Sequence, residues 1–257
     1  VIASESSFAS SSRVGAFVEE AATRACFTCA WDDLSLRFAP DLPSSPDDIS
    51  VRLRHPSGRL VHPDASFVRR VVARGHVVFD VADPAPGRWY VEVTTALHTR
   101  SRYTAAGFVS SPLVVDVRTP SARLVPGAPL DILVRARLEG SAVEALSARA
   151  TVSSPRSSVS AVRRRHAREL DALRAALPAG EADADPSAAA LLELDRRHGG
   201  ELLRRRSSAL AFRPHLDGLR ARVVTGAGGS YSVRVLVRGR AGGRPFERWA
   251  LISAVVG

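Results

Sequence analysis

The side chains in this sequence with the most evident chemistry are arginines, which occur in three short runs between residues 163 and 206. A guanidinium group presents a rigid fork of donors that suits phosphate, sulfate and carboxylate. Runs of this kind predict a surface that binds an anionic polymer or an acidic partner. The candidate partner-binding residues are Arg163, Arg164, Arg165, Arg196, Arg197, Arg204, Arg205 and Arg206.

The sequence favours a solvated polar face over a binding surface for these runs. Consecutive arginines point around a helix rather than along one side, and acidic residues such as Glu169, Asp171, Glu193 and Asp195 lie between the runs. Aromatic residues make up only 6% of the chain, which leaves few platforms for stacking nucleic-acid bases. Among possible partners, an acidic protein or a glycan therefore fits better than nucleic acid.

Signatures of catalysis are missing from the sequence. It contains no G-x-S-x-G elbow, no Walker loop and no G-x-G-x-x-G after a strand. We therefore expect no catalytic residues, no enzyme activity and no cofactor. An enzyme whose site is assembled across loops stays as an alternative, because a spatial triad needs no local motif.

Metal ligands are also too few to predict a metal site. Cys26 and Cys29 form a CxxC, but a metal site needs about four ligands and no other cysteine exists. On a strand the two cysteines would lie on opposite faces about 10 Å apart, so we expect free thiols, at least one of them in the core. His55 and His62, with Asp64 close by, flank a Pro-Ser-Gly corner but lack a fourth ligand.

Two histidines of the second half each precede a glutamate by three residues. His166 is followed by Glu169, and His198 is followed by Glu201. On a helix this spacing brings the two side chains together, and it predicts two separate solvated contacts.

The elements of the first half are short strands. Apolar and polar residues alternate from residue 13 to about 108, with Pro, Gly, Asp and Ser clusters between the runs. Such a pattern predicts two antiparallel sheets packed face to face. The expected strands are 14–20, 24–31, 48–54, 76–81, 87–95 and 102–109.

The second half repeats this pattern after a Ser-Ser-Pro link, so we place a domain boundary near residue 111. The expected domains are an N-terminal β-sandwich over 1–111 and a C-terminal β-sandwich over 112–257. The fold class is mainly β, with tandem immunoglobulin-like or fibronectin-like sandwiches. The expected strands are 113–119, 129–138, 145–154, 209–214, 218–224, 231–239 and 246–256.

A helical hairpin interrupts the second sandwich at about 158–206. Apolar residues recur at spacings of three and four over 158–177, which predicts one amphipathic helix capped by Ser157 or Ser158. Asp185 followed by Pro186 predicts the start of a second helix, which would extend to Leu202 with a break at Gly199 and Gly200. Residues 178–185 would form an acidic loop between them.

Composition sets the remaining limits. The chain has 257 residues, a net charge of +10, no Met and no Lys, so every basic residue is Arg. An all-arginine basic set points first to a GC-rich genome rather than to a function. We expect no membrane span, because no apolar run approaches about eighteen residues. The absence of Met suggests a processed product or a segment of a longer protein.

The order of the motifs resembles the β-rich region that follows the von Willebrand factor A domain in calcium-activated chloride channel regulators and similar bacterial secreted proteins. The resemblance rests on "DISVRLRHPSGR", "PAPGRWYVEV", the stretch from "PLVVDVRTPSARLVPG" to "RATVSSP", and "GSYSVRVLVRG". It implies tandem sandwiches that act as spacers or interaction modules beside an adhesive or proteolytic domain. The acidic loop of that family reads "TGAGGSYSV" here, so a calcium site in it is not expected.

Together these features predict a non-catalytic structural or interaction module of a secreted or cell-envelope protein. Its partner would be another protein or an adjacent domain of the same polypeptide, with an anionic surface or glycan as the alternative. The sequence does not identify that partner, the oligomeric state, the flanking domains or a role for the helical insert beyond packing.

Overall fold

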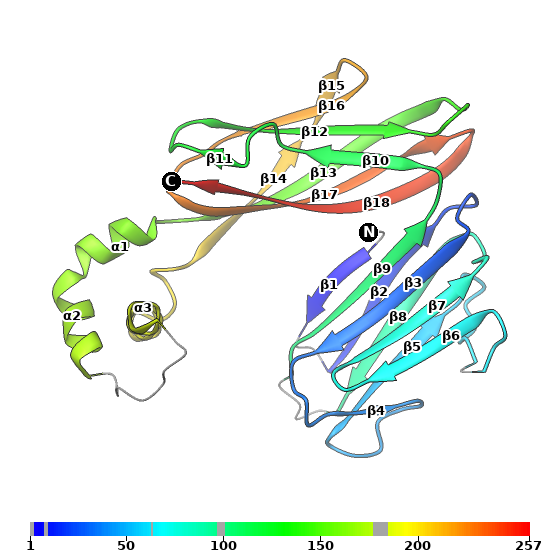
Figure 1. Cartoon of the computed structure of the whole chain (residues 1–257), viewed down its shortest axis with the longest axis horizontal. Helices are drawn as coiled ribbons and strands as arrows, with labels where there is room; N and C mark the ends of the chain where they lie inside the picture. The colour runs from blue at the N-terminus through cyan, green and yellow to red at the C-terminus, as the bar shows by residue number, and fades with distance from the viewer. Residues whose placement is uncertain (1–2, 8–9, 63, 97–100, 177–184) are drawn as a thin grey trace. The chain divides into compact units, whose positions relative to one another are not determined.

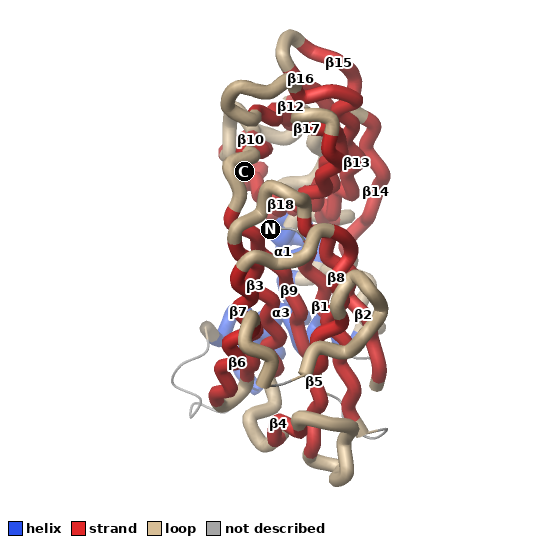
Figure 2. Tube along the Cα trace, turned by 90° about the vertical axis from the view of Figure 1, so that its right-hand side faces the viewer, coloured by secondary structure: helices blue, strands red, loops and turns tan. Residues whose placement is uncertain are grey.

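The structure is a computed structural model that describes residues 3–7, 10–62, 64–96, 101–176 and 185–257. Strands make up most of the described chain (Figure 1 and Figure 2). The chain forms two compact units, and strands β10, β12, β13, β17 and β18 contribute residues to both. Unit 1 comprises Val1–Asp116, Arg135–Ala148 and Leu236–Ala250, and unit 2 comprises Val117–Val134, Arg149–Val235 and Leu251–Gly257.

The first nine strands form two sheets, both in unit 1. One has the order β1-β9-β3-β7-β6 and the other the order β2-β8-β5-β4. Neighbouring strands in these two sheets are antiparallel except β4 and β5, which are parallel. The strands are β1 (Ala3–Ser7), β2 (Ser11–Val18), β3 (Arg24–Trp31), β4 (Arg37–Ala39), β5 (Asp48–Arg54), β6 (Val68–Ala73), β7 (His76–Ala82), β8 (Gly87–Thr95) and β9 (Tyr103–Ser110).

The two sheets of unit 1 enclose one apolar core. Phe27 of β3 stacks on Trp89 of β8 with 5.5 Å between ring centroids, so the sheets face each other. Both side chains are fully buried, and the Trp89 indole N–H donates to the Ala85 carbonyl at 2.9 Å. Burial of large aromatic side chains is the main stabilising contribution of such a core. Alternate residues of β7 and β8 are buried, as the alternation of apolar and polar residues predicts.

The remaining strands form two further sheets, with the orders β10-β12-β16-β15 and β11-β18-β17-β13-β14. Alternate residues of β12, β16 and β17 are buried, as the period of two predicts. The strands are β10 (Val114–Arg118), β11 (Arg123–Leu124), β12 (Pro129–Arg137), β13 (Val143–Pro155), β14 (Arg205–Ala211), β15 (Arg213–His215), β16 (Gly218–Val224), β17 (Gly229–Ala241) and β18 (Arg244–Val256).

The prediction of a mainly β chain of antiparallel sandwiches with a helical insert is confirmed. Sequence reasoning did not identify β1, β4, β6, β11 or β15, which are short, polar or buried at a single position. The strand predicted at 209–214 is wrong as one element, because β14 pairs with β13 whereas β15 pairs with β16 in another sheet. The boundary near residue 111 falls between β9 and β10 and stays a prediction.

The cysteines are free, as expected. Cys29 is fully buried in the core of unit 1, and burial raises the pKa of its thiol to about 12. Cys26 points to the other face of β3 and is partly exposed. None of the helices that the structure describes has the length and apolar character needed to cross a membrane.

Candidate functional site

The helical insert emerges between two strands that pair with each other. Strands β13 and β14 are antiparallel, and their last register partners are Pro155 and Arg205. The Arg156 N–H donates to the Arg204 carbonyl at 3.2 Å and closes the base of the insert. Residues 156–204 therefore leave and re-enter the sheet at one point, as an insertion at the tip of a β-hairpin does. The described helices are α1 (Val159–Arg165), α2 (Ala167–Ala176) and α3 (Pro186–Arg197).

The first part of the insert is two helices rather than the single helix predicted over 158–177. Ser158 caps α1 by accepting from the Ala161 N–H at 3.1 Å, which confirms one of the two predicted caps. His166 ends α1 with a φ of −114° and a ψ of 26°, so the chain breaks before α2 begins at Ala167. The spacing of the apolar residues does not reveal this break, because apolar residues continue at helical spacing on both sides of it.

The second part begins as predicted, with Asp185 accepting from the Ser187 N–H at 2.9 Å. Helix α3 ends at Arg197, and Gly199 and Gly200 then adopt φ values of 67° and 78°. Only glycine takes this left-handed backbone without strain, so the predicted break is confirmed. Leu202 is wrong as a helical residue, although it packs on the apolar core of the insert. The predicted acidic loop lies outside the described residues except for Asp185.

A small apolar core of their own holds the three helices together. Leu194 of α3 is fully buried, and Leu170 and Leu173 of α2 are almost so. The core cluster consists of Val162, Leu170, Leu173, Ala190, Leu191 and Leu194. This cluster contains no residue of the sheets, so the insert behaves as a small packed body carried by β13 and β14.

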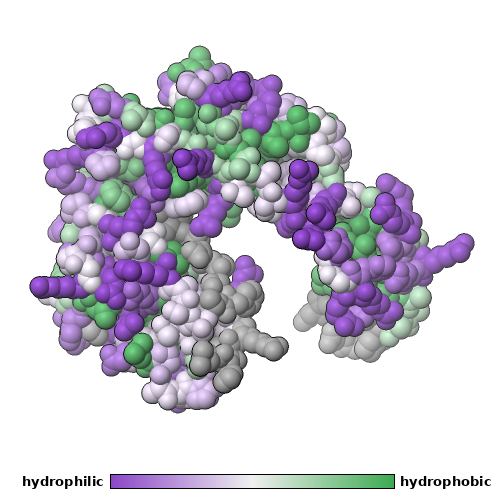
Figure 3. Space-filling model, turned by 180° about the vertical axis from the view of Figure 1, so that it is seen from behind, coloured by the Kyte–Doolittle hydropathy of each residue, from purple (hydrophilic) through white to green (hydrophobic). Residues whose placement is uncertain are grey.

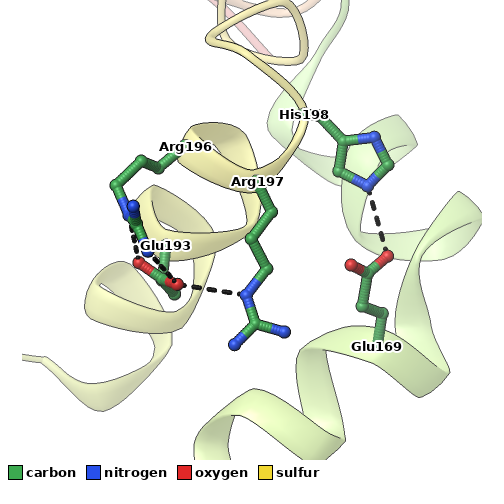
Figure 4. A network of polar contacts seen from close by, with 5 residues as sticks. All are labelled: Glu169, Glu193, Arg196, Arg197 and His198. Atoms are coloured by element: carbon green, nitrogen blue, oxygen red, sulfur yellow. Dashed lines mark hydrogen bonds and ion pairs between the residues drawn. The ribbon is translucent and has the colours of Figure 1, made fainter.

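All eight predicted arginines are exposed, but they differ in whether their guanidinium groups have a partner. Arg196 and Arg197 both donate to Glu193, at 2.7 Å and 3.0 Å (Figure 4). The hydrogen bonds from Arg196 and Arg197 hold the pKa of Glu193 down to about 2. These two guanidinium groups are therefore already paired with a carboxylate.

The third run is not helical, which corrects the prediction of a hairpin that carries three runs. Arg205 and Arg206 lie in β14, and Arg204 precedes it. Arg204 pairs with Glu201 at 2.5 Å. Arg205 donates from Nε to the Ser153 hydroxyl and from Nη2 to the carbonyls of Ser153 and Ser230, so it anchors the base of the insert to the sheet.

The guanidinium groups of four of these arginines have no hydrogen-bond or ion-pair partner within the described ranges, namely those of Arg163, Arg164, Arg165 and Arg206. In the view of Figure 3 the insert lies on the right, where hydrophilic residues in purple surround smaller hydrophobic areas in green. Residues 156–206 contain 11 arginines and 8 acidic residues, whereas the rest of 113–257 contains 13 arginines and 6 acidic residues. The insert therefore carries mixed charge, and most of the basic excess lies elsewhere in the second half.

Three ionisable side chains converge at the ends of the three helices. The Glu169 Oε2 atom lies 3.5 Å from His166 Nδ1 and 3.3 Å from His198 Nε2 (Figure 4 shows the second contact). The two imidazole rings meet edge to face, with 4.9 Å between centroids. The hydrogen bond with His198, and then that with His166, lower the pKa of Glu169.

This cluster corrects one expectation from the sequence. The predicted contact between His166 and Glu169 is confirmed, but His198 contacts Glu169 instead of Glu201. The helix has ended at Arg197, so the spacing of three no longer brings His198 and Glu201 together, and Glu201 pairs with Arg156 and Arg204. The sequence indicates the pair of His166 and Glu169 by their spacing. It does not indicate His198 as the third residue of the cluster, because His198 lies 29 positions away from Glu169.

Concave surfaces elsewhere include a hollow of about 520 Å³ in unit 2, whose lining contains Arg213, His215, Arg220 and Arg222, and a smaller one in unit 1. In unit 1 a hollow of about 220 Å³ is lined mainly by apolar residues, among them Leu113, Leu138 and Phe246. Typical sites for small molecules are larger, at roughly 300–1,000 Å³, and combine apolar walls with convergent polar groups. His62 and Asp64 are both largely exposed and lie 3.8 Å apart, and the His55 ring packs against Trp89 instead of joining them.

Comparison with protein-family models gave no match, and comparison with curated proteins gave none either. Among solved structures, a DUF4785 family protein from Legionella pneumophila is similar with a TM-score of 0.51 and 8% identity, over 98% of this chain and 61% of that protein. An alpha-2-macroglobulin from Salmonella reaches a TM-score of 0.27 at 13% identity, over 94% of this chain and 15% of that one. The first similarity shows a shared β-rich fold and assigns no activity.

Proposed function

We propose that this chain is a non-catalytic structural and interaction module of a secreted or cell-envelope protein. In this role the β-sandwiches support the helical insert and present it to a protein partner or to an adjacent domain. The observation that carries the proposal is the insertion itself, which leaves the sheet between the paired residues Pro155 and Arg205 and folds around its own core. Insertions at such points tolerate change well, and loops on rigid scaffolds commonly carry function.

The charge pattern supports a protein partner rather than a polyanion. Mixed arginine and carboxylate groups favour a complementary mixed surface, and they weaken attraction to a uniformly negative polymer. The resemblance to regions that follow a von Willebrand factor A domain agrees with this role and with an extracellular setting.

Replacing residues 156–204 by a short Gly-Asn turn tests the first part of this proposal. We expect the sheets to stay folded, because β13 and β14 would still pair up to Pro155 and Arg205. Far-UV circular dichroism of the strands should then show an unchanged unfolding midpoint. A collapse of the sheets would show that the insert is part of the sandwich core and would contradict the proposal. Turnover of ester, peptide or glycoside substrates by the purified chain would contradict the non-catalytic assignment.

Binding of an acidic partner by the insert is the second candidate function, favoured by the four unpaired arginines. Columns of immobilised polyglutamate and of heparin separate a carboxylate partner from a sulfated polymer. We expect replacement of Arg163, Arg164, Arg165 and Arg206 by Ser to reduce retention on polyglutamate more than on heparin. A control with the same charge change replaces the exposed Arg59, Arg69, Arg74 and Arg102 of unit 1. Equal losses in the two variants would show that only net charge matters.

A further inference from the structure

The cluster of His166, Glu169 and His198 has the composition of a metal site. Two imidazoles and one carboxylate are a ligand set that zinc proteins use, with a fourth position left for water. The three ligand atoms all lie within 4.8 Å of one another. Sequence reasoning predicted no metal site, because it counted ligands around the cysteines and the Pro-Ser-Gly corner and treated the two helical histidines as separate.

The distances around Glu169 are those expected for ligands that share one metal ion. Bonds of about 2.1 Å to a tetrahedral zinc ion place two ligand atoms roughly 3.4 Å apart. The two contacts of Glu169 Oε2 measure 3.5 Å and 3.3 Å. Hydrogen bonds between nitrogen and oxygen are usually shorter, at about 2.7–3.2 Å. Both contacts are at the long end for hydrogen bonds, and both match the spacing of two ligand atoms on one ion.

The backbone holds each ligand at a helix end. His166 lies at the break between α1 and α2, Glu169 lies in the first turn of α2, and His198 follows the last residue of α3. The C-terminal end of α3 carries partial negative charge, which favours a cation near His198. The apolar core of the insert packs α2 against α3, and this packing fixes the helices that carry the ligands.

Access and charge also decide what the cluster can bind. The side chains of Glu169 and His198 are 39% and 38% exposed, so an ion and a water ligand can enter from solvent. Arg196 and Arg197 are next to His198 in sequence, but Glu193 neutralises part of their charge. With three protein ligands and basic neighbours, we expect affinity in the micromolar range rather than that of a closed four-ligand site.

We propose that His166, Glu169 and His198 bind one divalent transition-metal ion of the zinc class, which ties the α1–α2 break to the end of α3. The ion would act as a clamp on the insert and hold its helices in one arrangement. This proposal does not depend on the interaction role proposed above, since the ligands differ from the arginines assigned to that role.

Calorimetric titration of the chelator-treated full chain with Zn²⁺ tests the site. We expect one ion per chain, and at least tenfold weaker binding for Glu169→Gln and for His198→Asn. His62→Asn is the matched control, because His62 also lies near a carboxylate but belongs to no group of three possible metal ligands among the described residues. Binding to the control should equal binding to the unaltered chain. Absence of Zn²⁺ binding, or binding that Glu169→Gln and His198→Asn leave unchanged, would overturn the proposal.

A second measurement avoids the risk that a variant unfolds the insert. X-ray absorption of the Zn²⁺-loaded, unaltered chain counts imidazole ligands directly, and we expect two of them with oxygen ligands completing the shell. A shell with fewer than two imidazoles would place the ion elsewhere and would overturn the proposal even if binding is tight.

Discussion

Unit 1 and the helical insert of unit 2 both pair glutamate with arginine, but in opposite surroundings. In unit 1 the side chains of Glu19 and Arg248 are 5% and 9% exposed, and both guanidinium Nη atoms reach the carboxylate. On α3 the side chains of Glu193 and Arg196 are 26% and 76% exposed. Burial removes water as a competing partner, so we expect loss of the first pair to lower the stability of unit 1 strongly. Loss of the second pair should change mainly the charge of an exposed surface.

A second buried acid extends the network in unit 1. The Glu247 carboxylate is 7% exposed and accepts from Arg88 at 3.2 Å and from Arg238 at 2.8 Å. The Arg248 guanidinium also donates to the Glu247 carbonyl at 3.0 Å. Burial by itself would raise the pKa of Glu19. The hydrogen bond and the charge of Arg248 lower this pKa, and the net shift is downward. The comparison therefore predicts that equal chemical changes have very unequal costs.

The largest expected effect is that of Glu19→Gln. It leaves the buried Arg248 charge without a counterion, and we expect a loss of about 3–5 kcal/mol in the free energy of unfolding of unit 1. All three tryptophans, Trp31, Trp89 and Trp249, belong to unit 1, so urea unfolding followed by tryptophan fluorescence reports on it. The matched control is Glu20→Gln, because Glu20 pairs with Arg244 at an exposed position. Equal effects of the two changes would show that burial of the pair does not increase its contribution to stability.

The next effect concerns the core of the insert. Leu194→Ala deletes a fully buried side chain, and we expect a loss of about 2–5 kcal/mol in local stability. The described helices all lie in the insert, so circular dichroism at 222 nm follows it, whereas tryptophan fluorescence should not change. Leu192→Ala is the control, since Leu192 is 63% exposed. A simultaneous change in fluorescence would show that the insert and unit 1 unfold together.

A smaller effect is expected at Asp131 of β12. Hydrogen bonds from Arg222 and Arg220 lower its pKa to about 2. A carboxyl whose folded-state pKa is lowered stabilises the fold above its unfolded-state pKa of about 3.9, and this contribution is lost as the pH falls to about 2. Since both arginines are partly exposed, we expect Asp131→Asn to cost about 1 kcal/mol at pH 7.

Hydrogen exchange of the β12 and β16 amides measures this contribution locally. Exchange in Asp131→Asn should be several-fold faster at pH 7, and the two proteins should converge near pH 2 after correction for the intrinsic rate. Asp64→Asn is the control, because its carboxylate is 86% exposed. A difference that persists at pH 2 would show that packing rather than charge is responsible.

The smallest effect is expected for Glu193→Gln. The change frees Arg196 and Arg197 at an exposed position, so the thermal midpoint of the insert should not move beyond experimental error. Retention on polyglutamate should rise, because two more guanidinium groups become available. A clear loss of helicity would show that the exposed pairs hold α3 together.

Local patterns in the sequence were sufficient for most of the strands and for the helix starts. β3, β5, β8 and β16 have the predicted ends, because alternation and turn residues are both local signals. The cap at Asp185 and the glycine break are local as well. The helix break at His166 has no such signal. The chain also passes from one sheet to another between Ala211 and Arg213, because β14 pairs with β13 whereas β15 pairs with β16.

By itself, the sequence determined that the chain folds as strands with a helical insertion, because side-chain periodicity follows directly from backbone geometry. It also determined which residues carry charge. Only the tertiary structure decided which of these charges are neutralised, which are buried and which converge. Pairing of Glu19 with Arg248 and of Glu169 with His198 spans 229 and 29 positions, and such contacts form only when packing brings the segments together.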